Sequence, residues 1–119
     1  MAQFLAVYLG SPDSAAMAHW KTLSPEVHAQ RQQQGTAAWH AWVERNQGAI
    51  VVMGGPLGKT LRVSNAGVAA SSNALSAFTI VEAESQEAAA AMFEDHPHFA
   101  IFPGEAVEIM PIMPVPGAA

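Results

Sequence analysis

Four segments of the chain are rich in apolar residues and are bounded by turn-forming residues. The first is an unbroken apolar run over 4–9 that ends at Gly10, a pattern typical of a strand buried on both faces. The second ends at Gly54-Gly55-Pro56, residues that punctuate strands and turns. We therefore expect strands over 4–9, 49–53, 75–81 and 105–113.

Three stretches between these segments open with a helix-start signal. Residues 11–13 (SPD) and 24–26 (SPE) each place a capping hydroxyl, a proline and an acid in the order that favours a helix N-terminus. Ser85 precedes an acidic and Ala-rich stretch in the same way. We expect helices from these signals to about Thr22, to about Asn46 and through Phe93.

The longest of these helices changes character at Gly35. Its first half is polar almost all round, whereas Trp39, Trp42 and Val43 form an apolar stripe in the second half. A glycine inside a helix costs roughly 1 kcal/mol relative to alanine. The pattern predicts deep packing for the second half only, with a loosened or kinked helix at Gly35.

The order of elements predicts an α+β fold with a ferredoxin-like βαββαβ protomer. Residues 61–63 and 68–70, joined by a Ser-Asn-Ala-Gly turn, predict a small extra hairpin. Two βαβ-type halves pack most simply as a four-stranded antiparallel sheet with its helices on one face. We expect one domain over 1–113 and a C-terminal tail over 114–119.

The predicted strands are apolar on both faces, which has a consequence for assembly. In the first strand Phe4 and Tyr8 alternate with Leu5 and Val7, so both faces of the sheet carry apolar side chains. A sheet face of this kind that is left uncovered forms a large sticky patch. A second copy of the chain is the simplest cover, and we expect a homodimer that buries the sheet face.

Composition narrows the classes of partner. The chain has 119 residues, 13% of them charged, with five Lys and Arg residues against ten acids and a net charge of −5. Five scattered cations cannot form the basic face that a nucleic-acid binder needs. The chain has no cysteine, and its first ten residues form a strand pattern instead of a signal peptide or membrane span. We expect a cytoplasmic protein with no nucleic-acid or membrane partner.

Titratable residues crowd against core sequence in the segment Asp95-His96-Pro97-His98. An imidazole oriented by a carboxylate suits proton transfer with a small molecule, so Asp95 and His96 are candidate catalytic residues. A structural interpretation is also open, because a histidine near a helix C-terminus is favoured by the dipole and Pro97 would stop the helix.

Other residues could complete a site with that segment. The spacing of His96 and His98 would point both rings to one side of an extended segment, where they could bind a metal, but two histidines are too few, and we expect neither a metal nor a cofactor. His40 lies between Trp39 and Trp42 at the edge of the predicted core, where a structural role for its imidazole is open beside a catalytic one. Tyr8, Trp39 and His98 are candidate substrate-binding residues, since an aromatic wall suits a flat substrate.

The combination of several short motifs resembles the YCII-related (YciI-like) proteins over essentially the whole chain. The motifs are residues 53–58 (MGGPLG), 82–89 (EAESQEAA), 95–99 (DHPHF), 103–104 (PG) and 107–111 (VEIMP). The resemblance implies a dimeric α+β barrel built from ferredoxin-like protomers.

The same resemblance implies a His–acid pair in the cleft between sheet and helices. One branch of the family acts as a dehydrochlorinase on a chlorinated hydroxyquinol, and most members have no assigned reaction. His40 is the nearest match to the family's helix histidine. Where the family has Asp-Pro, this chain reads Asp95-His96-Pro97, so either Asp95 or His96 takes the acid position.

Two functional hypotheses follow. The first is a small-molecule enzyme that uses a His/Asp pair for proton transfer or a related elimination. The second is a non-catalytic dimeric module that binds a small ligand and whose histidines are structural. Accessibility separates the two hypotheses, because a catalytic imidazole should face a pocket whereas a structural imidazole should be buried and hydrogen-bonded.

Overall fold

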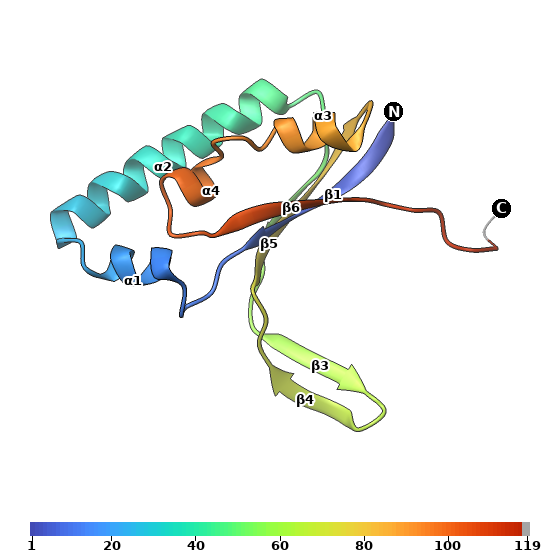
Figure 1. Ribbon diagram of the computed structural model, residues 1–119, viewed down its shortest axis with the longest axis horizontal. Helices are drawn as coiled ribbons and strands as arrows, with labels where there is room; N and C mark the ends of the chain where they lie inside the picture. The colour runs from blue at the N-terminus through green and yellow to red at the C-terminus, as the bar shows by residue number, and fades with distance from the viewer. Residues whose placement is uncertain (118–119) are drawn as a thin grey trace.

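The computed structural model describes residues 1–117 and has the predicted ferredoxin-like α+β fold (Figure 1). The main sheet contains β1 (Ala2–Leu9), β2 (Ile50–Pro56), β5 (Leu75–Ala83) and β6 (Ala106–Pro111). A separate hairpin contains β3 (Thr60–Ser64) and β4 (Gly67–Ser71). The helices are α1 (Ala15–Lys21), α2 (Pro25–Asn46), α3 (Gln86–Ala91) and α4 (Pro97–Ala100).

The main sheet has the strand order β2-β5-β1-β6, and every neighbouring pair is antiparallel. The two central strands are β1 and β5, with Phe4 opposite Val81 and Tyr8 opposite Ala77. This order is that of the predicted βαββαβ protomer, and the prediction is confirmed. The pairing of β2 with β5 is interrupted by two register shifts, between Ile50 and Val52 and between Val52 and Gly55.

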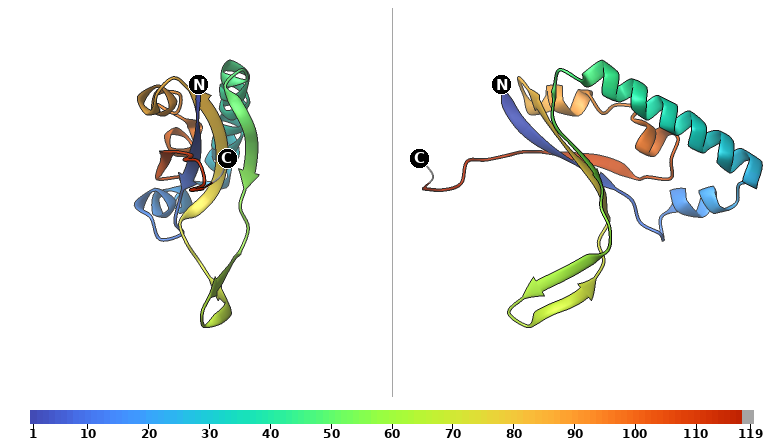
Figure 2. Two further views of the ribbon diagram at one scale, coloured as in Figure 1. Left: turned by 90° about the vertical axis from the view of Figure 1, so that its right-hand side faces the viewer. Right: turned by 180° about the vertical axis from the view of Figure 1, so that it is seen from behind.

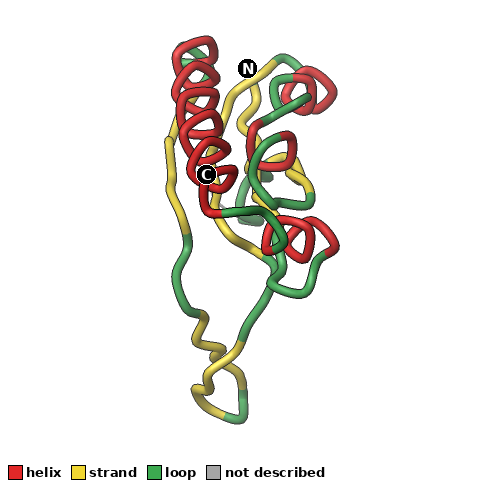
Figure 3. The backbone as a smooth tube through the Cα atoms, turned by 90° about the vertical axis from the view of Figure 1, so that its left-hand side faces the viewer, coloured by secondary structure: helices red, strands yellow, loops and turns green. Residues whose placement is uncertain are grey.

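Within residues 1–117 the four helices lie on one face of the main sheet, and no helix covers the other face (Figures 2 and 3). The core lies between the helices and the covered face of the sheet, where alternate residues of β1 point inward. Its buried hydrophobic residues are Phe4, Ala6, Tyr8, Trp42, Val81, Ala83, Ala89 and Phe93. The Trp42 indole N–H also donates a hydrogen bond of 2.6 Å to the Met92 carbonyl, which ties α2 to the end of the α3 segment.

Two of the three predicted helix starts are confirmed. The side chains of Ser24 and Ser85 accept hydrogen bonds from the amides of Val27 and Ala88 at the first turns of α2 and α3. The first helix begins later than predicted, with Ser14 as its cap. The Ser11 hydroxyl instead accepts a bond from the Asp13 amide, which makes residues 11–13 a turn before the helix.

The predicted kink at Gly35 is wrong, since α2 is continuous over its 22 residues. Gly35 is buried, and a Cβ atom placed there would lie 2.5 Å from two carbon atoms of the Phe102 ring. The glycine therefore lets the loop after α4 pack against the helix. Gly35 is thus a point of close packing in the polar first half of α2, where His28 also stacks on Trp20 and Arg31 donates to the Ile101 carbonyl.

The extended geometry considered for His96-Pro97-His98 is wrong, although α3 does end before Pro97. Pro97 is the first residue of α4, and His96 caps this helix by accepting a hydrogen bond of 3.0 Å from the His98 amide. Proline suits the first helical position because its missing N–H has no intrahelical partner there. The extended geometry that would have pointed both imidazoles to one side is therefore absent from residues 96–98.

The predicted hairpin is confirmed and forms an arm that projects away from the domain (Figure 1). At the other end of the chain, β6 ends at Pro111, two residues earlier than predicted. Residues 114–117 of the predicted tail are exposed, and residues 118–119 lie outside the described part of the chain. No helix within residues 1–117 is both long and apolar enough to cross a bilayer.

Candidate functional site

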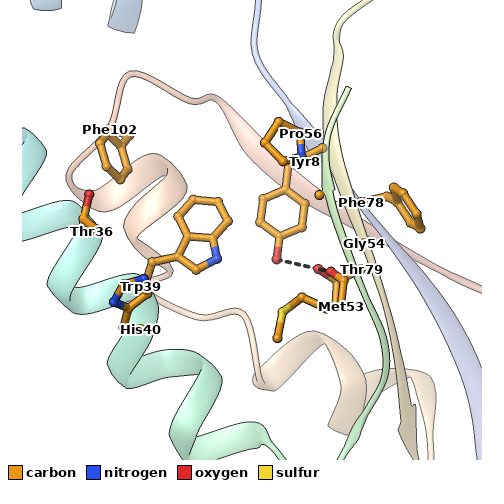
Figure 4. Close-up of a pocket in the computed structure, with 12 residues that line it drawn as sticks. Tyr8, Thr36, Trp39, His40, Met53, Gly54, Pro56, Phe78, Thr79 and Phe102 are labelled. Carbon is orange, nitrogen blue, oxygen red and sulfur yellow. Dashed lines mark hydrogen bonds between the residues drawn. The ribbon is translucent and has the colours of Figure 1, made fainter. Parts of the chain in front are cut away.

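A cavity of about 460 Å³ lies between α2 and the β2–β5 side of the sheet (Figure 4). Helix α2 and the loop after α4 form one wall, and the sheet forms the other. The lining residues are Tyr8, Thr36, Trp39, His40, Met53, Gly54, Gly55, Pro56, Ala77, Phe78, Thr79 and Phe102. This volume is within the range of small-molecule sites, and the lining is mainly apolar with a few polar groups.

Tyr8 and Trp39 face each other across the space between sheet and helix (Figure 4). Their rings are stacked, with centroids 5.2 Å apart and planes inclined by 13°. The Tyr8 ring is fully buried, whereas Trp39 is half-buried. The Trp39 ring therefore supplies the accessible aromatic surface of the pair, and the Tyr8 ring packs against it from the sheet side.

The Tyr8 hydroxyl is held in a short hydrogen-bond chain. Its oxygen lies 3.2 Å from Thr79 Oγ1, and Thr79 Oγ1 donates to the Met53 carbonyl at 3.0 Å. A threonine hydroxyl has one hydrogen, so Tyr8 is the donor to Thr79. Burial raises the pKa of the Tyr8 phenol, an effect that the Thr79 bond partly offsets. Tyr8 is therefore a neutral phenol at physiological pH.

Among the described residues that line this cavity, His40 is the one imidazole. It follows Trp39 on α2, and Thr36 lies one helical turn before it on the same side of the helix. Its side chain is exposed. The His40 imidazole is therefore accessible both to water and to a molecule in the cavity.

His96 is fully buried within a cluster of aromatic rings. The ring centroids of Tyr8, Trp39, Trp42 and Phe93 lie between 4.5 and 5.8 Å from its own. Burial, and then the neighbouring His98, lowers the pKa of His96 to about 4, so its ring is neutral at pH 7. Because Nδ1 accepts the His98 amide proton, the ring hydrogen is on Nε2, which has no hydrogen-bond partner within residues 1–117.

His98 has a structural anchoring role. Its Nε2 donates a hydrogen bond of 2.8 Å to the Leu9 carbonyl, which joins α4 to the end of β1. Burial lowers the pKa of His98, and the bond to Leu9 acts in the opposite direction. Gly104 packs directly against this ring, and a Cβ atom there would overlap both the His98 imidazole and its carbonyl.

Asp95 lies outside this cluster. Its side chain is exposed, and its φ of 56° is in the left-handed region that aspartate tolerates better than most residues. One ring nitrogen of His96 is bonded to the His98 amide and the other has no partner. Neither nitrogen of His96 is therefore paired with the Asp95 carboxylate.

The structure thus brings three of the six predicted site residues to the cavity: Tyr8, Trp39 and His40. His96 and His98 contact Tyr8 and Trp39 but are not among the lining residues. Within residues 1–117 no three His, Cys, Asp or Glu side chains gather in a group that could hold a metal ion.

Sequence reasoning missed Thr79 and Phe102 as lining residues. Thr79 had a detectable signal, since it is a hydroxyl residue inside the apolar strand β5, opposite Ala6 of the core. Phe102 had none, because its position depends on α4 and on its contact with Gly35.

Comparison with known proteins gives one line of support, at the level of the fold. No protein-family model matches the chain, and no curated protein matches it. A solved structure of 5-chloro-2-hydroxyhydroquinone dehydrochlorinase from Burkholderia phenoliruptrix AC1100, in complex with 2,5-dihydroxybenzoquinone, matches with a TM-score of 0.50. The identity is 21%, over 90% of this chain and 89% of the dehydrochlorinase chain. At this identity the match shows a shared fold.

Proposed function

We propose that this protein is a small-molecule enzyme that moves a proton to or from a flat, unsaturated substrate held between α2 and the sheet. The observation that carries the proposal is the combination of the half-buried Trp39 ring, backed by the stacked Tyr8 ring, with His40 in one cavity. Stacking on an aromatic surface orients a planar ring, and an accessible imidazole is the usual general acid or base near neutral pH.

Hydroxylated aromatic compounds and quinones are the proposed substrate class. The cavity is wide enough for a single six-membered ring with substituents, and its lining is mainly apolar and aromatic. The dehydrochlorinase that shares the fold binds 2,5-dihydroxybenzoquinone, a ring of this kind. That similarity adds support at the level of the fold, and the lining of this cavity supplies the chemical argument.

In this proposal His40 is the acid–base residue, whereas His96 positions the aromatic wall. His96 contacts both rings of the stacked pair, and its low pKa keeps it neutral. The predicted pairing of Asp95 with His96 is left out of the proposed mechanism, because the Asp95 side chain is exposed and His96 bonds elsewhere.

A second candidate function is non-catalytic binding of the same class of ligand. One observation favours it: the two buried histidines have structural roles, His96 as the cap of α4 and His98 as its anchor to β1. Under this alternative His40 contributes contact area at the mouth of the cavity and no proton transfer.

We also propose that the protein acts as a homodimer that buries the helix-free face of the main sheet, as in a dimeric α+β barrel. That face carries large apolar side chains, including Met110, which is 40% exposed, and the half-buried Leu5 and Ile80. Burying such a face removes apolar surface from water at about 25 cal/mol per Å².

Proton transfer can be measured without knowing the natural substrate. We expect the protein to catalyse hydrogen–deuterium exchange, followed by NMR, at a ring carbon of a compound from a panel of hydroxyquinols, hydroxyquinones and enolisable carbonyl compounds. His40→Ala should lower the exchange rate 10²- to 10⁴-fold, the range for loss of a general acid or base. His19→Ala removes an exposed histidine from α1, outside the cavity, and should leave the rate unchanged.

Binding measured on the same panel separates the two candidate functions. Compounds that bind with no exchange, and whose affinity falls only modestly in His40→Ala, would favour the binding module. Exchange that survives in His40→Ala would remove His40 from the proposed mechanism.

A further inference from the structure

The β3–β4 arm has one apolar face and one polar face. In its register Leu61 is opposite Ala70 and Val63 is opposite Val68, and opposed residues of an antiparallel pair share a face. Thr60, Arg62 and Ser64 alternate with them and lie on the other face. The arm is therefore an amphipathic ribbon of two strands.

The apolar face of the arm is uncovered in the single chain. Leu61 is 70% exposed, Val63 is 76% exposed and Val68 is 66% exposed. A two-stranded hairpin is marginally stable in water unless its apolar face packs against something. Because apolar and polar residues alternate along both strands, the exposed apolar face of the arm is expected to pack against another molecule.

Charge narrows the nature of that surface. Residues 57–75 contain Lys59 and Arg62 and no acid, so the arm is basic in a chain of net charge −5. Outside the arm, the chain has ten acidic residues and only three Lys or Arg residues. A surface that complements the arm is apolar and carries acidic residues. The rest of this chain has such an excess of acidic residues over basic ones.

The helix-free face of the main sheet has this composition. Phe4, Ala6 and Tyr8 of β1 point into the core, so Leu5 and Val7 point to the helix-free face. Residues paired with these two share their face: Ile80 and Met110 with Leu5, Phe78 and Glu108 with Val7. Glu82 lies on the same face, opposite Gln3. The face therefore combines an apolar centre with two carboxylates.

We propose that in the homodimer the arm of each copy lies across the helix-free sheet face of the other copy, with its apolar face against the sheet. This arrangement rests on the homodimer proposed above and specifies the element that completes it. Lys59, at the start of the arm, lies at the rim of the contact, whereas Arg62 points away from the sheet and adds to the attraction for the partner's Glu82 and Glu108 at longer range. A reciprocal exchange of two unlike patches forms a closed interface with two-fold symmetry. The arm also adds to the area that the dimer buries. A standard interface covers about 10% of a small protein's surface, and the whole accessible surface of this chain is 7982 Å².

Cross-linking tests the arrangement directly, because the chain has no cysteine of its own. One copy would carry Val63→Cys on the arm and a second, differently tagged copy would carry Met110→Cys on the sheet face. After co-expression and treatment with a short bis-maleimide, we expect the mixed Val63–Met110 product to dominate. Val27→Cys, at an exposed position on the helix side, is the matched control and should give no product with Met110→Cys.

The outcomes separate this inference from the homodimer proposal. A monomer in sedimentation analysis overturns both. A dimer in which Val63→Cys links only to Val63→Cys, or to nothing, overturns the arm placement and leaves the sheet-face dimer standing.

Charge reversal gives an independent measurement. Lys59→Glu with Arg62→Glu should raise the dimer dissociation constant at least tenfold, and Glu82→Lys with Glu108→Lys in the same chain should restore it. Lys21→Glu with Arg45→Glu makes the same charge change on α1 and α2 and should have little effect. Equal weakening by both double reversals, with no restoration, would contradict the proposed contact.

Discussion

Tyr8 joins the buried cluster to the open cavity. Its ring stacks on Trp39, meets His96 and His98 edge to face, and ends in the hydroxyl bonded to Thr79. A change at His96 therefore reaches the cavity wall through the packing of Tyr8 and Trp39. Packed aromatic contacts transmit such changes because interiors have little free volume.

We predict that His96 makes stability depend on pH. Burial lowers its pKa from 6.5 to about 4, so between these values the unfolded chain binds a proton that the folded chain does not. The free energy of unfolding should therefore be highest above pH 6.5 and fall as pH decreases towards 4, with a slope of up to about 1.4 kcal/mol per pH unit for one proton.

Urea denaturation from pH 8 to pH 4 measures this effect. His96→Gln has no titrating ring and should show a shallower decrease than the original chain, whereas His19→Gln should show the same decrease. A profile for His96→Gln as steep as that of the original chain would assign the dependence to other groups, beginning with His98, whose pKa is also lowered by burial.

Residue types near the site could be predicted from the sequence, but their roles could not. Local sequence placed Asp95, His96 and His98 side by side, and pairing of the first two followed from proximity along the chain. The backbone at Asp95 instead has a positive φ, and the His96 ring is buried among side chains from β1, α2 and the end of α3. Contacts between distant elements decide these positions.

Helix α2 shows which features of an element are local. Its start at Ser24-Pro25 was predicted correctly because capping and proline preferences act within one turn. Its straight path through Gly35 was not, since the glycine is explained by Phe102, far along the chain. The role of Pro97 could not be predicted from local sequence either. A proline can follow the end of one helix, and it can also be the first residue of the next.

Gly35→Ala should destabilise the protein, against the usual trend for helices. Alanine normally stabilises a helix interior by about 0.5–1 kcal/mol relative to glycine, but here the added methyl group would overlap the Phe102 ring. We expect a net loss of about 1–3 kcal/mol, typical of overpacking, measured by chemical denaturation.

A double-mutant cycle tests the cause of that loss. In a Phe102→Leu background the same Gly35→Ala change should cost much less, since the ring atoms are gone. Gly48→Ala, with nothing within 4 Å of the added carbon, is the control with little expected effect. An equal cost in both backgrounds would show that Phe102 is not the cause.

At the scale of the whole molecule, the arm and the main sheet should be separable. Their strands belong to two different sheets, and the β2–β5 pairing ends at Pro56 and Ala77, before the arm begins. Replacing residues 59–73 by a short glycine-rich linker should preserve the circular dichroism spectrum of the domain. The shortened protein should dimerise at least tenfold more weakly in sedimentation analysis, and unchanged dimerisation would exclude the arm from the interface.

The two edges of the main sheet differ in regularity. At one edge β6 pairs with β1 in unbroken register, whereas at the other edge β2 is interrupted twice. Bulges of this kind twist an edge strand and spoil its fit to another flat strand. The irregular β2 edge therefore hinders the pairing of one copy with the next into a continuous sheet. This disfavours fibril growth at that edge and favours assemblies of fixed size.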